Sequence, residues 1–140
     1  MQTFLPYEKF SESAKVLDMR RLGKQRVECL QLLNALINGG AWSKHPAAKM
    51  WKNYEFCLIS YGLEICTEWI KRGYKDTCYN KILKCGDLLK YKSSPIPPWL
   101  GDDRLHSSHR SNLLRKNKEY YSRFQWIEPD NLPYYWPIGF

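Results

Sequence analysis

The sequence predicts an all-α protein: a compact single domain, residues 1–140, built as a bundle of three to four helices. Three observations lead to this prediction. Apolar residues recur at intervals of three and four, the spacing of one helix face, and no convincing strand pattern interrupts them. The 140 residues are enough for one domain with a sizeable core. The composition, 44% hydrophobic and 15% aromatic, is that of a folded domain.

The first long helix is expected over residues 11–37, after an extended N-terminal segment, MQTFLPY. Pro6 disfavours helix at the residue before it, Ser11 is a suitable N-cap, and Gly39 and Gly40 end the pattern. Several apolar residues cluster on one side of this helix and are expected to face the core: Met19, Leu22, Leu30, Leu33 and Ile37.

The second helix has the most regular pattern, and Gly73 after two basic residues marks its end. Its apolar positions are Trp51, Tyr54, Leu58, Tyr61, Ile65 and Trp69. A shorter helix over residues 77–90 is weakened by Gly86. A Pro-rich loop, SSPIPPWLGDD, then leads to a last helix over residues 104–124. The C-terminal tail, WIEPDNLPYYWPIGF, is expected to be irregular and aromatic.

The charge points to an anionic partner. The net charge is +8 and the pI is near 9.3, and nucleic acid is the commonest partner of such proteins. The five cysteines include no CxxC pair, no signal peptide is recognisable, and no apolar run approaches the roughly 20 residues that span a bilayer. We therefore expect a soluble, cytoplasmic chain with reduced thiols and no membrane contact.

The stretch RRLGKQRVECLQLL, residues 20–33, combines four basic residues with one carboxylate. Arg21, Gln25 and Glu28 are spaced i, i+4 and i+7, so they share a helix face that should point away from the core. Two interpretations remain open. One is a solvated face on which Lys24 pairs with Glu28 and contributes little stability. The other is a site that meets a polyanion and performs acid–base chemistry on it.

Arg26 falls among the apolar positions of this helix if the helix is unbroken. An unpaired guanidinium there would be costly. Either Arg26 pairs inside the protein, for example with an acid of the second helix, or the helix bends near Gly23 and turns Arg26 outward.

A second basic cluster occupies RLHSSHRSNLLRKNKEYYSRF, where Glu119 is the single acid. Basic residues interleaved with Tyr120, Tyr121 and Trp126 are typical of a surface that tracks phosphates and stacks bases. Alternatively, the tyrosines belong to the core and the charges only keep the protein soluble. His45, before Pro46, is expected to be a turn or cap residue, or to line a site.

No metal or cofactor is assigned. His106 and His109 could ligate zinc together with Cys78 and Cys85, but the CysX6Cys and HisX2His spacings fit no standard zinc module. The chain also has no GxSxG, Walker loop, HExxH or Gly-rich dinucleotide turn, so the chemistry of those motifs has no support.

The run LDMRRLGKQRVECL resembles the first long helix of the small pyrimidine-dimer DNA glycosylases of the bacteriophage endonuclease V type. The matching positions are Asp18, Arg21-Leu22, Gln25 and Glu28. The resemblance continues through EWIKRGYKDT and PPWLGDDRLHSSHRSNLLRKNKEYY to the Trp/Tyr-rich C-terminus, so it covers nearly the whole chain. The MQTFLPY and HPAAKMW stretches look closer to a subfamily of small bacterial and viral proteins placed beside the glycosylases.

The resemblance implies a mostly helical domain that bends duplex DNA and flips a nucleotide out of the stack. An N-terminal α-amine, partly neutral at physiological pH, would attack the sugar C1′, expel the base through an imine and permit β-elimination. By this resemblance Glu28 is the acid–base group. The nucleophile is the amine of Met1, because Gln2 should block methionine removal, or that of Thr3 if the first two residues are processed away.

The expected function is therefore DNA base excision by a glycosylase, with or without AP-lyase activity, on damaged or modified bases such as pyrimidine dimers. A non-catalytic DNA- or RNA-binding module of the same fold and a protein-interaction domain are the alternatives. We expect a monomer that acts on double-stranded DNA and is associated with the nucleoid or with viral DNA. The residues expected to bind DNA are Arg20, Arg21, Lys24, Gln25, Arg26, His45, His106, His109, Arg110, Arg115, Lys116, Tyr120, Tyr121 and Trp126.

Overall fold

The computed structural model describes residues 1–91 and 93–138, and all regular secondary structure in these residues is helical. The all-α prediction is confirmed. The long helices are α2 (Met19–Asn38), α4 (Glu55–Lys71) and α6 (Asp103–Lys116). The short ones are α1 (Phe10–Val16), α3 (Pro46–Trp51), α5 (Tyr79–Cys85) and α7 (Lys118–Tyr121), with single 3-10 turns at η1 (Ala41–Lys44), η2 (Gly86–Leu88) and η3 (Ser122–Phe124).

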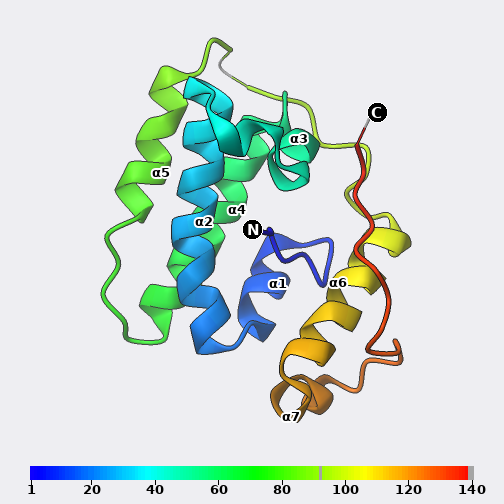
Figure 1. The fold of residues 1–140 in the computed structure, drawn as a ribbon. Helices are drawn as coiled ribbons and strands as arrows, with labels where there is room; N and C mark the ends of the chain where they lie inside the picture. The colour runs from blue at the N-terminus through cyan, green and yellow to red at the C-terminus, as the bar shows by residue number, and fades with distance from the viewer. Residues whose placement is uncertain (92, 139–140) are drawn as a thin grey trace.

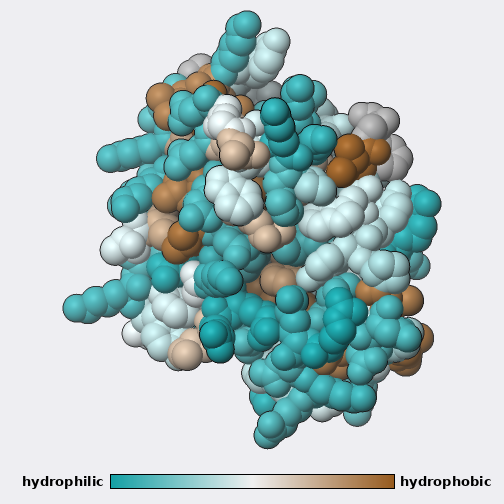
Figure 2. All heavy atoms as spheres, in the orientation of Figure 1, coloured by the Kyte–Doolittle hydropathy of each residue, from teal (hydrophilic) through white to brown (hydrophobic). Residues whose placement is uncertain are grey.

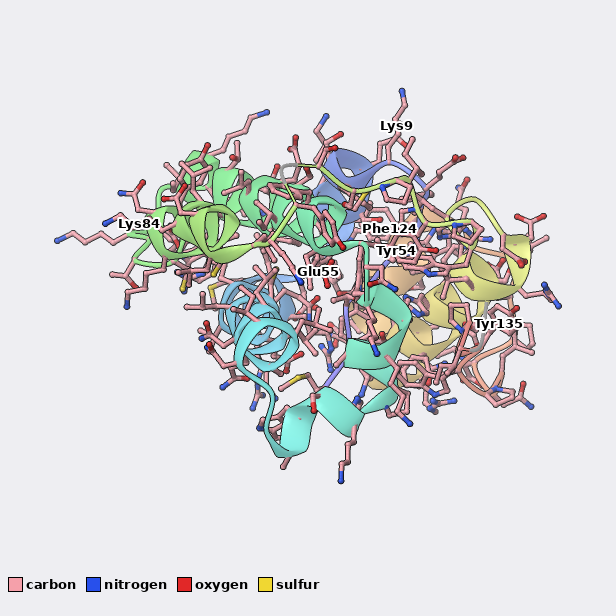
Figure 3. The ribbon with its side chains drawn as sticks, turned by 90° about the horizontal axis from the view of Figure 1, so that it is seen from above. Lys9, Tyr54, Glu55, Lys84, Phe124 and Tyr135 are labelled. Atoms are coloured by element: carbon pink, nitrogen blue, oxygen red, sulfur yellow. The ribbon has the colours of Figure 1, made fainter. Side chains whose placement is uncertain are left out.

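The helices form two groups on either side of the N-terminal segment (Figure 1). In one group α2, α4 and α5 pack on one another, and α1 packs on α4. The other group consists of α6, α7 and the C-terminal tail, which runs beside α6. In the view from above, Lys84 of α5 and Tyr135 of the tail mark opposite sides of the molecule (Figure 3). The first residues of the chain are therefore at the centre of the protein.

The single helix expected over residues 11–37 is in fact two helices, and that prediction was wrong. The helix is interrupted at Leu17 and Asp18, which adopt extended conformations with ψ angles of 135° and 159°. The Tyr121 hydroxyl accepts a hydrogen bond from the Asp18 N–H at 3.0 Å and donates one to the Asp18 carboxylate. A distant aromatic residue thus satisfies the backbone at the break. Met19, which was expected in the core, begins α2 and is 52% exposed.

The second predicted helix is also interrupted, because Trp51 ends α3 and α4 begins at Glu55. Between them Asn53 has a φ of 74°, a left-handed conformation that asparagine tolerates well. Gly73 follows α4 with a φ of 96°, as the predicted helix end requires. In the last predicted helix, residues 104–124, Asn117 separates α6 from α7, because its φ and ψ of −154° and 78° are not helical.

Two glycines permit close packing where α2 crosses α4. Gly62 of α4 leaves no room for a side chain, because an added Cβ would lie 2.6 Å from Cys29 Sγ and 3.1 Å from a methyl carbon of Ile82. Gly23 of α2 has a similar role, since its Cβ would lie 2.9 Å from the ring of Trp69. The two glycines allow the helices to pack closely on their larger neighbours.

We expect Gly62→Ala to lower the free energy of unfolding by about 1 to 3 kcal/mol, the usual cost of overpacking a core. Chemical denaturation measures this change. Adding Cys29→Ala to Gly62→Ala should recover part of the loss, because it removes the nearest clashing atom. A Gly62→Ala variant as stable as the original chain would contradict the close packing described here.

Two histidines of α6 hold the N-terminal segment in place. The Leu5 N–H donates to His109 Nδ1 at 2.8 Å, and the Leu5 carbonyl lies 2.7 Å from His106 Nδ1. Because the Gly101 N–H donates to His106 Nε2 at 2.9 Å, the network assigns the proton of His106 to Nδ1. Both histidines are buried. They have a structural role here, and we no longer include them among residues that contact DNA.

The buried His109 should make stability depend on pH. Burial is the main cause that lowers the pKa of His109 from its ordinary 6.5 to about 3, and the charge of His106 adds to it. The unfolded chain therefore binds a proton more readily below pH 6.5, so stability falls with pH down to about 3. Between pH 7 and 5 the loss should be about 2 kcal/mol.

Denaturant titrations at several pH values measure this effect. His109→Gln keeps an acceptor for the Leu5 N–H but cannot titrate, so its stability should vary less over the same pH range. Equal pH dependence in both proteins would assign the effect to other groups.

The C-terminal tail is bound along α6 by polar side chains of that helix. Asn112 Nδ2 donates to the Leu132 carbonyl at 3.0 Å, and the Ser111 hydroxyl accepts from the Leu132 N–H at 2.9 Å. The Ser108 hydroxyl accepts from the Tyr135 N–H at 3.2 Å. These bonds explain how an irregular, aromatic tail, as predicted, keeps a fixed path.

Candidate functional site

A basic pocket of about 470 Å³ lies where the chain's first residues pass between α2 and α6. Its lining residues come from four parts of the chain: Met1, Gln2, Phe4, Arg20, Arg21, Lys24, Glu28, Lys116 and Tyr134. Hydrophilic side chains gather over the middle of the face that contains the N-terminus (Figure 2). We call this cavity the basic pocket.

The basic pocket is strongly cationic. Arg20, Arg21 and Lys24 follow one another along the first turns of α2, and Lys116 is the last residue of α6. Among the residues that the structure describes, Glu28 is the single acid that lines it. A concave surface with such an excess of positive charge concentrates anions. The structure therefore brings together six of the residues that the sequence suggested for this site: Met1, Arg20, Arg21, Lys24, Glu28 and Lys116.

Glu28 contacts the N-terminal segment. Its carboxylate Oε2 accepts a hydrogen bond from the Gln2 N–H at 3.3 Å, one residue from the α-amine, and another from Gln25 Nε2 at 3.1 Å. Lys24 Nζ lies 3.9 Å from the other oxygen, Oε1, but the Lys24 side chain is 73% exposed. Such an exposed pair holds its partner weakly. One carboxylate oxygen thus accepts two hydrogen bonds, and the other faces the exposed ammonium group of Lys24.

Gln25 connects the segment to α2. Its Oε1 accepts hydrogen bonds from the Phe4 N–H at 3.0 Å and the Tyr61 hydroxyl at 2.7 Å. Its Nε2 donates to the Gln2 carbonyl at 2.8 Å and to Glu28. The prediction that Gln25 points away from the core was wrong. It is 1% exposed, because the N-terminal segment covers this face of α2.

His45 caps α3 beside the N-terminus. Its Nδ1 accepts a hydrogen bond from the Ala47 N–H at 3.0 Å, so the neutral ring carries its proton on Nε2. Burial is the main cause that lowers the pKa of His45, and the charge of the N-terminal amine adds to it, while Glu28 acts in the opposite direction. The sequence predicted a cap or a site-lining residue; the cap is confirmed.

Lys116 approaches the same carboxylate from α6. Burial lowers the pKa of Lys116, and the charges of Arg21, Arg115 and Lys24 lower it further, whereas Glu28 raises it. Arg115 itself is exposed and bonds the Asp130 carbonyl at 3.3 Å. The end of α6 therefore adds positive charge to the basic pocket, whose other cationic side chains come from α2.

Arg26 is absent from the basic pocket. It pairs with Asp76 at 2.7 Å, and its guanidinium lies 4.3 Å from the ring centroid of Trp69. The pair is mostly buried, with side-chain exposures of 14% and 3%. The first alternative for Arg26, an internal pair, is correct, but the acid belongs to the loop after α4 rather than to a helix. We no longer include Arg26 among the DNA-binding residues.

Other predicted residues also serve the fold. Arg110 donates to the Pro6 carbonyl at 2.7 Å and pairs with Glu128 at 2.9 Å, so both ends of its guanidinium are used. Thr3 is fully buried and its hydroxyl accepts from Trp51 Nε1 at 3.0 Å. These contacts give both side chains a structural role, and Arg110 leaves the DNA-binding set. The α-amine that Thr3 would present if the first two residues were removed stays a prediction.

The aromatic residues of the second basic cluster split between core and surface. Tyr121 is fully buried and bonds Asp18, as described above. Trp126 is half-buried and stacks on the Tyr121 ring at a centroid distance of 5.6 Å. Tyr120 is half-buried beneath the guanidinium of Arg123, at 4.1 Å. The core interpretation is therefore correct for Tyr121, and these rings do not line the basic pocket.

The sequence did not single out Tyr134, Gln2 and Phe4, which also line the pocket. Gln2 and Phe4 are adjacent to the predicted amine, and their place could have been inferred from it. Tyr134 comes from the tail, 106 positions after Glu28. The sequence feature that could have indicated a role for Tyr134 is its position in the aromatic run LPYYWP.

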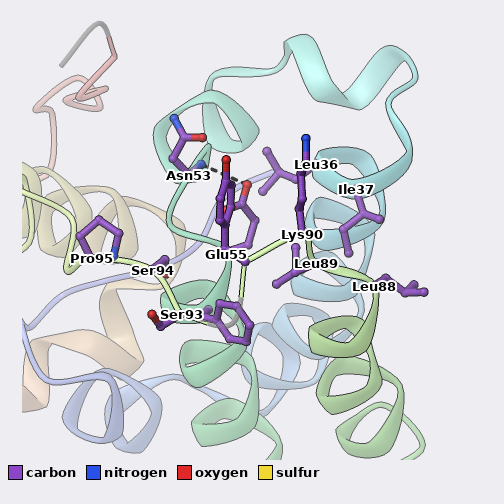
Figure 4. A pocket seen from close by; sticks show the side chains of 12 residues that line it. Leu36, Ile37, Asn53, Glu55, Leu88, Leu89, Lys90, Ser93, Ser94 and Pro95 are labelled. Atoms are coloured by element: carbon purple, nitrogen blue, oxygen red, sulfur yellow. Dashed lines mark hydrogen bonds between the residues drawn. The ribbon is translucent and has the colours of Figure 1, made fainter.

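A second pocket of about 510 Å³ lies at the far end of α2, beside the start of α4 and the segment after η2 (Figure 4). Leu36, Ile37 and Phe56 make its wall largely apolar. Its carboxylate, on Glu55, accepts a hydrogen bond from the Asn53 N–H at 3.1 Å and so helps to begin α4. This pocket has little of the charge that an anionic polymer requires, and we do not favour it as the site.

Within residues 1–91 and 93–138 no three His, Cys, Asp or Glu side chains are grouped so that they could hold a metal ion. Among the same residues no helix combines the length and apolar character of a membrane span.

The fold and the pocket together define a small helical protein whose N-terminus and one carboxylate share a cationic cavity. A family model described as pyrimidine dimer DNA glycosylase matches residues 1–81, more than half of the 140 residues. The chain belongs to this family, and the resemblance of its first long helix is confirmed. The match includes Met1 and Glu28 but not α6 or the tail, which supply Lys116 and Tyr134. Neither the curated proteins nor the solved structures gave a match.

Proposed function

We propose that this protein is a DNA glycosylase with AP-lyase activity that removes damaged or modified bases, such as pyrimidine dimers, from double-stranded DNA. Family membership supports the glycosylase activity. The observation that carries the proposal is the position of Glu28, 3.3 Å from the Gln2 N–H inside a pocket lined by four Arg and Lys side chains.

DNA binding comes first. Arg20, Arg21, Lys24 and Lys116 would contact phosphates around the pocket, and such contacts fix position without reading sequence. A cavity of about 470 Å³ is within the range of pockets that take small ligands, so it has room for one flipped nucleotide. Tyr134 lines the same cavity and offers a ring against which a base can pack.

The chemistry follows from an amine and a carboxylate in one pocket. The neutral α-amine of Met1 attacks C1′, a C–N bond forms, and the bond from C1′ to the base breaks as the base takes up a proton. The nitrogen then loses one proton, and the C1′–O4′ bond breaks as O4′ takes up a proton, which leaves an iminium ion at C1′. Glu28 stabilises this cation and accepts the C2′ proton, after which the C3′–O bond breaks with departure of the phosphate. Water then hydrolyses the imine and frees the enzyme.

Incubation with duplexes that carry either a pyrimidine dimer or an abasic site tests the proposal. We expect base release from the first, strand cleavage at the second, and binding that weakens steeply with salt. A non-catalytic binding module would show the salt-sensitive binding without product. Loss of binding even at low salt would leave only a protein-interaction domain.

A further inference from the structure

Beyond the basic pocket, the face of α2 that carries Glu28 borders a further hollow of about 290 Å³, distinct from both pockets described above. Its lining includes Gln31, Asn34 and Asn38 from the last half of α2 and Trp42 from η1. The three amide side chains are exposed, and so is Trp42, at 51%. We call this hollow the amide–indole site.

We propose that the amide–indole site binds an unpaired nucleobase, with the base stacked on Trp42 and its edge hydrogen-bonded by the amides of α2. This inference rests on the proposed function and adds a second binding subsite to it. An indole face stacks on any base, and Asn and Gln side chains pair with base edges, adenine above all. The ligand class is therefore a nucleobase that has left the duplex stack.

The charge along α2 changes in the order that such a ligand requires. Arg20, Arg21 and Lys24 occupy the first turns, and Glu28 follows in the middle of the helix. From Gln31 onward the exposed positions of this face carry amides instead of cations. Cations suit a phosphate backbone, whereas uncharged donors and acceptors suit a base. One helix face thus offers both kinds of contact in series.

A row of rings connects Trp42 with the basic pocket. Ring centroids are 5.9 Å apart from Trp42 to His45, 6.0 Å from His45 to Trp136 and 5.5 Å from Trp136 to Tyr134, which lines the basic pocket. Gly39 and Gly40, with φ angles of 80° and 107°, form the turn that carries η1 back beside α2. A base on Trp42 would therefore lie next to His45, at the other end of a row of rings that reaches the basic pocket at Tyr134.

Binding to two labelled duplexes tests this inference. One is fully paired, and the other contains a single unpaired 2-aminopurine, a fluorescent adenine analogue. For Trp42→Ala we expect the Kd of the unpaired-base duplex to rise by about 5- to 150-fold, the range for loss of one base–aromatic stack. The Kd of the paired duplex should change by less than about twofold. The double change Gln31→Ala and Asn34→Ala should act in the same direction.

The chain offers a matched control in Tyr91, an aromatic residue that is 73% exposed beside the apolar pocket at the far end of α2. Tyr91→Ala should leave both Kd values unchanged. Thermal unfolding of each variant verifies that it is folded. Equal binding of the unpaired-base duplex by Trp42→Ala and the original chain would overturn the inference, as would equal losses on both duplexes.

The two proposals fail separately. Trp42-dependent binding without base release would contradict the enzymatic function and leave the amide–indole site standing. If Trp42→Ala changes neither base release nor binding, the proposed enzymatic function would stand and the amide–indole site would be rejected. A chain that binds neither duplex at low salt would overturn both.

Discussion

Replacing Glu28 with glutamine should lower the rate of base release by about 10²- to 10⁴-fold, the usual contribution of a positioned acid–base group. The amide keeps the size of the side chain and can still accept from the Gln2 N–H, which lies 3.3 Å from the carboxylate. It can neither accept the C2′ proton nor stabilise a cationic imine. Single-turnover measurements of base release on a damaged duplex give this rate.

DNA binding separates this loss from misfolding. Removing one negative charge from a pocket lined by four cations should leave the Kd unchanged or lower it. Lys24→Gln is the comparison variant, because it removes the exposed partner at 3.9 Å without touching the acid. It should raise the Kd through the lost phosphate contact but leave the rate of base release from bound DNA close to that of the original chain. If Glu28→Gln releases base as fast as the original chain, the carboxylate has no part in the chemistry.

Blocking the N-terminal amine should abolish both base release and strand cleavage. An acetyl group on Met1, or a short extension before it, converts the amine into an amide that cannot form an imine. Residues 2–6 are buried, so an extension cannot displace them without loss of their hydrogen bonds. Product formation by acetylated and free chains, purified side by side, measures the effect.

Lys116→Arg provides the comparison for one of the two lysine amines of the pocket, the other being that of Lys24. It keeps the positive charge but removes the primary amine, so activity should remain close to that of the original chain. Full activity in the acetylated protein, combined with a large loss in Lys116→Arg, would move the nucleophile from the terminus to α6.

Periodicity predicted the helical class correctly because α2 and α4 bury apolar residues at helical spacing, Leu22 and Leu33 among them. The helix breaks were missed for a physical reason. Asp18 leaves the helix because the Tyr121 hydroxyl, 103 positions away, satisfies its N–H. Asn53 supplies a left-handed turn that other residues seldom adopt. Neither feature has a signature in a local pattern.

The predictions for the basic pocket were likewise correct where local spacing decides and wrong where contacts distant in the sequence decide. Local spacing was enough to place Arg21, Lys24 and Glu28 on one face of a helix. It could not show that the N-terminal segment covers part of that face, so Gln25 was expected outside and is buried. The histidines of α6 were expected on a DNA surface because they stand among basic residues. Their neighbours in space, Leu5 above all, give them another role.

The position of the amine relative to Glu28 is the feature on which the enzymatic account depends, and reductive trapping examines it directly. The protein is mixed with an abasic-site duplex and borohydride, and the covalent adduct is digested and mapped by mass spectrometry. The account predicts an adduct on the peptide that begins with Met1, reduced or absent for Glu28→Gln. An adduct confined to an internal lysine, or no adduct while the duplex is bound, would contradict it.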